Sequence, residues 1–230
     1  IKYGTDNMAK GPAMSREEAV KAIEVGIGMV ADLKEKGYNV LATGEMGIGN
    51  TTTSSAVCSV LLDQSVEKVT GKGAGLTNKD LEHKIEVIRQ SIALNKVNAD
   101  DPLDVLAKVG GLDIAGMAGC YIGGAALNIP VFIDGFISSV AALIAIRLVP
   151  ECAPYLFPSH CSNEPAGRMI LDAIGKQPYI FANMCLGEGT GAVMGFTIAD
   201  YAFKAYWELP SFEQTNFGTY EAVSYTHLTL

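Results

Sequence analysis

Two glutamates lie between glycines in separate loops of the sequence, Glu45 in GEMGIGN and Glu188 in LGEGTG. Each loop precedes a segment whose pattern predicts a helix, so each carboxylate would lie near a helix N-terminus. There it could simply complement the positive end of the helix dipole. A loop shaped for an anion is, however, a poor place for a second negative charge. The loops therefore favour a carboxylate that accepts a proton or stabilises a developing cation.

Glycines gather in four loops, which hold eleven of the 25 glycines: residues 44–49, 71–75, 110–111 and 187–191. Glycine lets backbone N–H groups approach a ligand closely. The first loop ends at a predicted helix start, where free N–H groups and the dipole favour a phosphate. Neither GEMGIGNTT nor GKGAGL fits a P-loop or a dinucleotide fingerprint. Each loop alone would more simply be a tight turn, but three of them before helices in one chain favour phosphate binding.

Helix and strand patterns alternate along the chain. Ser15 and Glu18 form a capping box ahead of apolar residues at three-and-four spacing. Short apolar segments predict buried strands at residues 38–43, 131–134, 155–157 and 179–183. This order predicts an α/β fold with a doubly wound, mainly parallel sheet flanked by helices, Rossmann-like in type. Ligands of such folds bind beyond the carboxyl ends of the strands, where these loops fall.

Composition narrows the classes of protein. The 230 residues, 49% apolar and 18% charged, can form a large core and are not typical of a disordered chain. A net charge of −8 without a basic run excludes nucleic acid as a partner. Apolar runs are too short for a membrane span, and five cysteines without a Cys-x-x-Cys pair predict free thiols and a cytoplasmic location. His160, Cys161 and Glu164 lack the regular four-ligand spacing of structural zinc, so no metal is expected.

Six motifs in fixed order resemble one enzyme family. They are GEMGIGNTT, GKGAGL with a downstream Lys84, VGGLDIAGMAG, VFIDGF, HCSNEPAG and LGEGTGA. Together they are similar to the nicotinate-nucleotide:dimethylbenzimidazole phosphoribosyltransferase family, which makes the lower-ligand nucleotide of cobalamin. The resemblance implies a catalytic domain over residues 1–222 that lacks the family's N-terminal part and with it part of a smaller helical domain. Residues 223–230, VSYTHLTL, resemble nothing in the family and are predicted to be a non-native tail.

The resemblance implies that nicotinate mononucleotide and dimethylbenzimidazole react to give α-ribazole 5′-phosphate and nicotinate, without a cofactor. Glu188 would be the general base, and Glu45 would stabilise positive charge. Phosphate and substrate would be bound by Gly47, Gly49, Asn50, Gly73, Ala74, Gly75, Lys84, Asp134, Gly135, Ser162 and Gly187. Within this set Asp134 would accept a ribose hydroxyl, and Ser162 would lie near the nicotinate. The resemblance also implies a homodimer.

Two other functions stay open on the sequence. A nucleotide-binding module could keep the phosphate loops without binding the base, and a related transferase could use another azole or a phenolic acceptor. Cys185 stands where family members commonly have a basic residue. The residues that select the base are expected in the N-terminal part without a counterpart here, so the preferred base is not set by this sequence.

Overall fold

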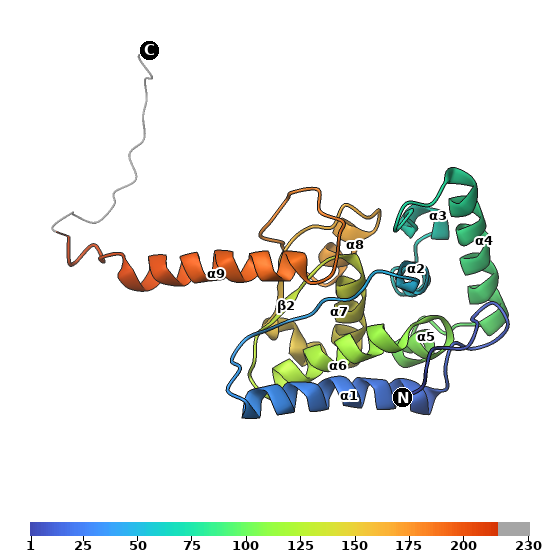
Figure 1. Cartoon of the computed structure of the whole chain (residues 1–230), viewed down its shortest axis with the longest axis horizontal. Helices are drawn as coiled ribbons and strands as arrows, with labels where there is room; N and C mark the ends of the chain where they lie inside the picture. The colour runs from blue at the N-terminus through green and yellow to red at the C-terminus, as the bar shows by residue number, and fades with distance from the viewer. Residues whose placement is uncertain (216–230) are drawn as a thin grey trace, which may run out of the picture. The chain divides into compact units, whose positions relative to one another are not determined.

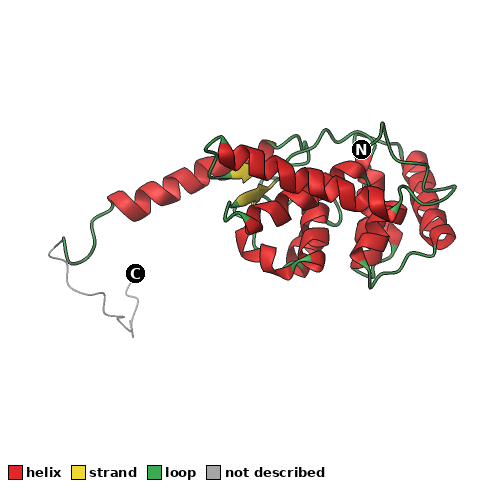
Figure 2. Cartoon of the chain, turned by 90° about the horizontal axis from the view of Figure 1, so that it is seen from below, coloured by secondary structure: helices red, strands yellow, loops and turns green. Residues whose placement is uncertain are grey.

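The computed structural model describes residues 1–215, so the predicted tail at residues 223–230 lies outside the described residues. The chain divides into two compact units, Ile1–Phe196 and Thr197–Leu230. Helices make up most of the described chain and the strands are short (Figure 2). The elements are α1 Arg16–Glu35, β1 Leu41–Ala42, α2 Asn50–Leu61, α3 Val66–Val69, α4 Asn78–Asn95, α5 Pro102–Val109, α6 Leu112–Ala126, β2 Val131–Ile133, α7 Phe136–Leu148, the 3₁₀ helix Pro150–Tyr155, β3 Leu156–Pro158, α8 Gly167–Ala173 and α9 Thr190–Glu208.

Three parallel strands form the sheet in the order β1-β2-β3. Val131 of β2 pairs with Leu41 on one side and with Leu156 on the other. All of β2 is buried, as expected for a central parallel strand. A parallel sheet flanked by helices confirms the predicted fold class.

The fourth predicted strand, at residues 179–183, is wrong. This segment makes only an isolated parallel bridge between Ile180 and His160. Tyr179 and Phe181 are exposed, so the segment lacks the burial that stabilises a strand against a packed face.

The helix starts follow the capping signals. The Ser15 hydroxyl accepts from the Glu18 N–H at 3.1 Å, and the Glu18 carboxylate accepts from the Ser15 N–H at 2.8 Å. These two bonds satisfy backbone donors that the first turn of α1 cannot pair internally. The α1 helix then ends just before Gly37, whose φ of +87° is left-handed.

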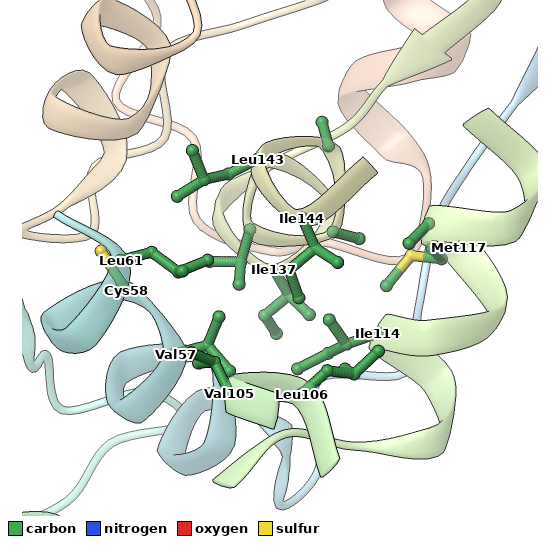
Figure 3. Close-up of a cluster of buried hydrophobic side chains, with 14 of the residues drawn as sticks. Val57, Cys58, Leu61, Val105, Leu106, Ile114, Met117, Ile137, Leu143 and Ile144 are labelled. Carbon is green, nitrogen blue, oxygen red and sulfur yellow. The ribbon is translucent and has the colours of Figure 1, made fainter. Parts of the chain in front are cut away.

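The hydrophobic core is centred on α7, which is buried from Phe136 to Ala145. Figure 3 shows side chains of α2, α5 and α6 meeting those of α7. The labelled ones are Val57, Cys58, Leu61, Val105, Leu106, Ile114, Met117, Ile137, Leu143 and Ile144. Because α7 follows β2 after a two-residue turn, this core also fixes the carboxyl end of the central strand.

Glycines let α1 and α6 approach closely, and Figure 1 shows the two helices side by side. A Cβ at Gly26 would lie 2.8 Å from the Cys120 nitrogen, and one at Gly119 would lie 3.0 Å from the Gly26 Cα. Both would also overlap a carbonyl oxygen of the facing helix. The contact is between backbones, so a flexible side chain cannot move aside to relieve it.

We expect Gly119→Ala to lower the free energy of unfolding by about 1–3 kcal/mol, because the added methyl must push the two helices apart. Urea denaturation followed by circular dichroism measures this. The matched control is Gly28→Ala on α1, where a Cβ would meet nothing within 4 Å. That change should stabilise the protein by about 0.5–1 kcal/mol through helix propensity. Equal effects of the two changes would contradict the close packing of α1 on α6.

Candidate functional site

A pocket of about 520 Å³ lies where the chain leaves the three strands. Residues 45–48 follow β1, residues 135–137 follow β2, and His160 and Ser162 follow β3. The full lining is Glu45, Met46, Gly47, Ile48, Thr51, Gly73, Ala74, Gly135, Phe136, Ile137, His160, Ser162, Glu164, Cys185, Leu186, Gly187 and Glu188. This is the carboxyl edge of the sheet, where the sequence predicts that a ligand binds.

Eight of the predicted site residues line this pocket: Glu45, Gly47, Gly73, Ala74, Gly135, Ser162, Gly187 and Glu188. The other five, Gly49, Asn50, Gly75, Lys84 and Asp134, are not among the lining residues. Asn50 and Lys84 still donate hydrogen bonds to residues that line it, Glu45 and Thr51 respectively. The fold therefore brings most of the predicted site residues together around the pocket. Asn50 and Lys84 lie one residue further out, in contact with the residues that line it.

The two glutamate loops touch each other. The Glu188 N–H donates to the Glu45 carbonyl oxygen at 3.1 Å. A Cβ at Gly44 would lie 2.5 Å from the Gly189 nitrogen, and a Cβ at Gly187 would lie 2.8 Å from Oε1 of Glu45. Glycine at these two positions is therefore what allows the loops to meet, and their meeting puts both carboxylates at one pocket.

Glu45 is a half-buried, oriented carboxylate. Its Oε2 accepts from the Gly47 N–H at 2.5 Å and from Asn50 Nδ2 at 2.7 Å. Burial raises the pKa of Glu45, and these two hydrogen bonds act in the opposite direction. Asn50 Nδ2 also donates to Asp113 Oδ2 at 2.8 Å. Asn50 thus fixes the Glu45 carboxylate from behind.

Glu188 is exposed and its backbone is left-handed, with φ of +59° between Gly187 and Gly189, both at +78°. A non-glycine residue in this region is unfavourable unless its surroundings impose it, and such residues cluster at functional sites. The Glu188 carboxylate makes no hydrogen bond to any of residues 1–215. It is free to accept a proton from a molecule in the pocket.

The N-terminus of α2 is open to an anion. Its N-cap, Gly49, has φ of +81° and provides no side-chain hydrogen bond. Lys84 is 7% exposed, and its Nζ donates to Thr51 Oγ1 at 2.9 Å and to the Gly71 carbonyl at 3.0 Å. Burial lowers the pKa of Lys84, while the charge of Glu164 raises it. Because Thr51 Oγ1 accepts from Lys84, its own proton is left to donate into the pocket.

The N-terminus of α9 is occupied instead. Both oxygens of Asp134 accept backbone N–H groups there: Oδ2 from Gly189 at 2.9 Å, and Oδ1 from Gly191 at 2.7 Å and Ala192 at 3.2 Å. Asp134 is 1% exposed. In the structure the Asp134 carboxylate accepts hydrogen bonds from backbone N–H groups. The contact of Asp134 with a ribose hydroxyl stays a prediction.

Among the lining residues that were not predicted as ligand contacts, three have strongly polar side chains: Thr51, His160 and Glu164. From the sequence, His160 and Glu164 were considered only as metal ligands, although both follow the end of a predicted strand. His160 is 2% exposed, and its Nδ1 lies 3.1 Å from Ser159 Oγ, which donates to the Ile133 carbonyl. Nδ1–H is therefore the donor in this pair, which leaves Nε2 as an acceptor. Burial lowers the pKa of His160, while Asp134 raises it.

The lowered pKa of His160 predicts how the stability of the folded protein depends on pH. In the unfolded chain a histidine takes up a proton below about pH 6.5, whereas folded His160, with its lowered pKa, does so only at lower pH. Stability should therefore fall as the pH drops through 6.5, with a slope of at most about 1.4 kcal/mol per pH unit from this residue. His160→Gln should lose this part of the slope. Urea titrations of both proteins between about pH 5 and pH 7.5 measure it, and parallel curves would contradict a buried neutral His160.

Residues 1–215 contain no group of three or more His, Cys, Asp or Glu side chains that could hold a metal ion. In the same range no helix is both long and apolar enough to cross a membrane.

The arrangement defines a class of protein. A glycine-lined pocket at the carboxyl edge of a parallel sheet, with an open helix N-terminus and two carboxylates, is typical of an α/β protein that binds a phosphorylated small molecule. A family model described as Phosphoribosyltransferase matches residues 1–217. The chain belongs to this family.

Related sequences and solved structures agree with this family assignment. The chain is 54% identical over 221 residues to nicotinate-nucleotide–dimethylbenzimidazole phosphoribosyltransferase of Ruminiclostridium cellulolyticum, and 51% identical to the protein of that name from Acetivibrio thermocellus. Each match covers 96% of this chain, which spans 63% of the length of either relative. The crystal structure of CobT from Thermus thermophilus superposes with a TM-score of 0.87 at 34% identity, covering 94% of this chain and 64% of that one.

Proposed function

We propose that the protein transfers the phosphoribosyl group of nicotinate mononucleotide to dimethylbenzimidazole, giving α-ribazole 5′-phosphate and nicotinate in cobalamin biosynthesis. The observation that carries this proposal is the meeting of the two glutamate loops in one pocket with the open N-terminus of α2. The names of the relatives at 54% and 51% identity support the choice of substrates.

The phosphate would bind at the N-terminus of α2. Free N–H groups of this helix, the Thr51 hydroxyl and the loop residues Gly73 and Ala74 surround this end of the pocket. A Cβ at Gly73 would lie 2.9 Å from Thr51 Oγ1, so the loop and the helix are in contact. Lys84 supplies the positive charge through Thr51. Since Asp134 already fills the N-terminus of α9, α2 is the better anion site of the two.

The flat rings would lie against the apolar part of the lining. Met46, Ile48 and Leu186 are largely exposed, and Phe136 begins α7 at the same pocket. Exposed apolar side chains around two carboxylates are suited to an aromatic base that must also release a proton.

Chemically, a ring nitrogen of the base attacks C1′ on the face opposite to nicotinate, which inverts the configuration from β to α. The bond between C1′ and the nicotinate nitrogen breaks, and its electron pair neutralises the pyridinium. The attacking ring becomes cationic, so its other N–H acidifies, and Glu188 takes that proton. Glu45, oriented by Asn50 and Gly47, stabilises positive charge on the ribosyl centre or the incoming ring. No step needs a cofactor.

We also propose that the protein acts as a homodimer in the cytoplasm. Five free cysteines support a reducing compartment. The dimer rests on resemblance to the family alone, and sedimentation of the purified protein tests it.

Calorimetry with nicotinate mononucleotide, followed by an assay with a panel of acceptor bases, tests the proposal against its two rivals. Mononucleotide binding with turnover of dimethylbenzimidazole supports it. Binding without turnover of any base would favour the nucleotide-binding module instead. Turnover confined to another azole or to a phenol would favour the related transferase.

A further inference from the structure

We propose that Asp134 is a positioning residue for Glu188. Its carboxylate, at the end of β2, holds the loop at residues 187–191 in the one conformation that directs Glu188 at the pocket. This inference rests on the proposed function, because it gives Asp134 a role through the general base.

The proposal is based on the hydrogen bonds of the Asp134 carboxylate, both oxygens of which accept N–H groups from the segment that follows Glu188. Asp134 accepts three N–H groups, from Gly189, Gly191 and Ala192, at 2.7–3.2 Å. These residues immediately follow Glu188 in the chain. Asp134 itself is 1% exposed, and the segment that carries it is fixed by the pairing of β2 with both neighbours. The loop is therefore tied to the end of the buried central strand of the sheet.

The backbone of Glu188 needs such a restraint. Three successive residues, Gly187, Glu188 and Gly189, have positive φ. Two of them are glycines with many accessible conformations, so the loop would otherwise populate many states. On its other side the loop has the bond from the Glu188 N–H to the Glu45 carbonyl. Together with Asp134, this bond holds Glu188 from both directions.

The close packing at Gly191 is a second observation that supports a specific contact between Asp134 and the start of α9. A Cβ there would lie 2.8 Å from Asp134 Oδ1 and would overlap the His160 ring. His160 Nδ1 lies 4.0 Å from Asp134 Oδ1 and is paired with Ser159 Oγ at 3.1 Å. The carboxylate, the imidazole and the first turn of α9 are thus packed without a gap, and a looser loop would have to break this packing.

Asp134→Asn tests the role, since an amide can accept through only one of its two atoms and loses at least one of the three bonds. We expect kcat to fall about 10- to 100-fold from misplacement of the base, with KM for nicotinate mononucleotide changed by less than about threefold. Asp172→Asn, at an exposed ion pair with Arg168, is the matched control and should keep the original kcat.

A double-mutant cycle separates positioning from direct contact with the substrate. If Asp134 acts through Glu188, Asp134→Asn should change kcat less than about threefold once Glu188→Gln is present. Full multiplication of the two effects would overturn the positioning role and favour contact with the ribose. Unchanged turnover in Glu188→Gln alone would instead remove the general base of the proposed function, and the positioning role with it.

Amide hydrogen exchange gives a readout that does not depend on turnover. The peptide covering residues 186–193 should exchange at least about tenfold faster in Asp134→Asn than in the original protein, with the core peptides of α7 unchanged. Unchanged exchange in this peptide would overturn the inference even if kcat falls.

Discussion

Replacing Glu188 by glutamine is expected to lower turnover by about 10²- to 10⁴-fold, because the amide cannot take the proton that the attacking ring releases. KM for the mononucleotide should stay within about threefold, since Glu188 makes no hydrogen bond that supports the phosphate end of the pocket. Steady-state kinetics with both substrates measures the two parameters separately. The side chains have nearly the same shape, so the loss reports on proton transfer and not on packing.

A matched control is Glu151→Gln, an exposed glutamate outside the pocket, which should leave turnover unchanged. Normal turnover of Glu188→Gln would show that another group accepts the proton.

Lys84→Met should weaken binding of nicotinate mononucleotide by about 10- to 100-fold, the usual range for loss of a charge-assisted hydrogen bond. Methionine keeps the apolar stem that packs in the buried position, but it removes the charge that Lys84 presents through Thr51. Because burial lowers the pKa of Lys84, its charge is held against a desolvation cost, so the variant should not be much less stable. Calorimetry measures the affinity and urea denaturation the stability.

Lys79→Met on the same helix is the control, since Lys79 is exposed and does not line the pocket. It should leave the affinity within about twofold, as expected for a screened surface charge. Equal losses in the two variants would mean that Lys84 acts only through the net charge of the protein.

Local signals in the sequence predicted the positions of the two glutamate loops well. Residues 44–49 and 187–191 combine glycine with a carboxylate directly before a helix, a pattern that can be recognised within ten residues. The same holds for the capping box at Ser15, whose two hydrogen bonds are both present. Such features depend on near neighbours in the chain, so sequence is enough to find them.

Features that depend on distant neighbours were not predictable in the same way. Residues 179–183 have a strand-like composition, but the sheet offers them no buried face. The carboxylate of Asp134 takes its partners from a loop 55 residues further along the chain. Lys84 reaches the pocket through Thr51, a contact across 33 residues. Residue type alone could not distinguish these arrangements from a direct contact with the ligand.

The central claim is tested most directly by incubating the protein with nicotinate mononucleotide and dimethylbenzimidazole and determining the product by NMR. We predict equimolar nicotinate and a new nucleotide with the α configuration at C1′. Nicotinate released together with only ribose 5-phosphate, a β-configured product, or no release of nicotinate at all would contradict the account.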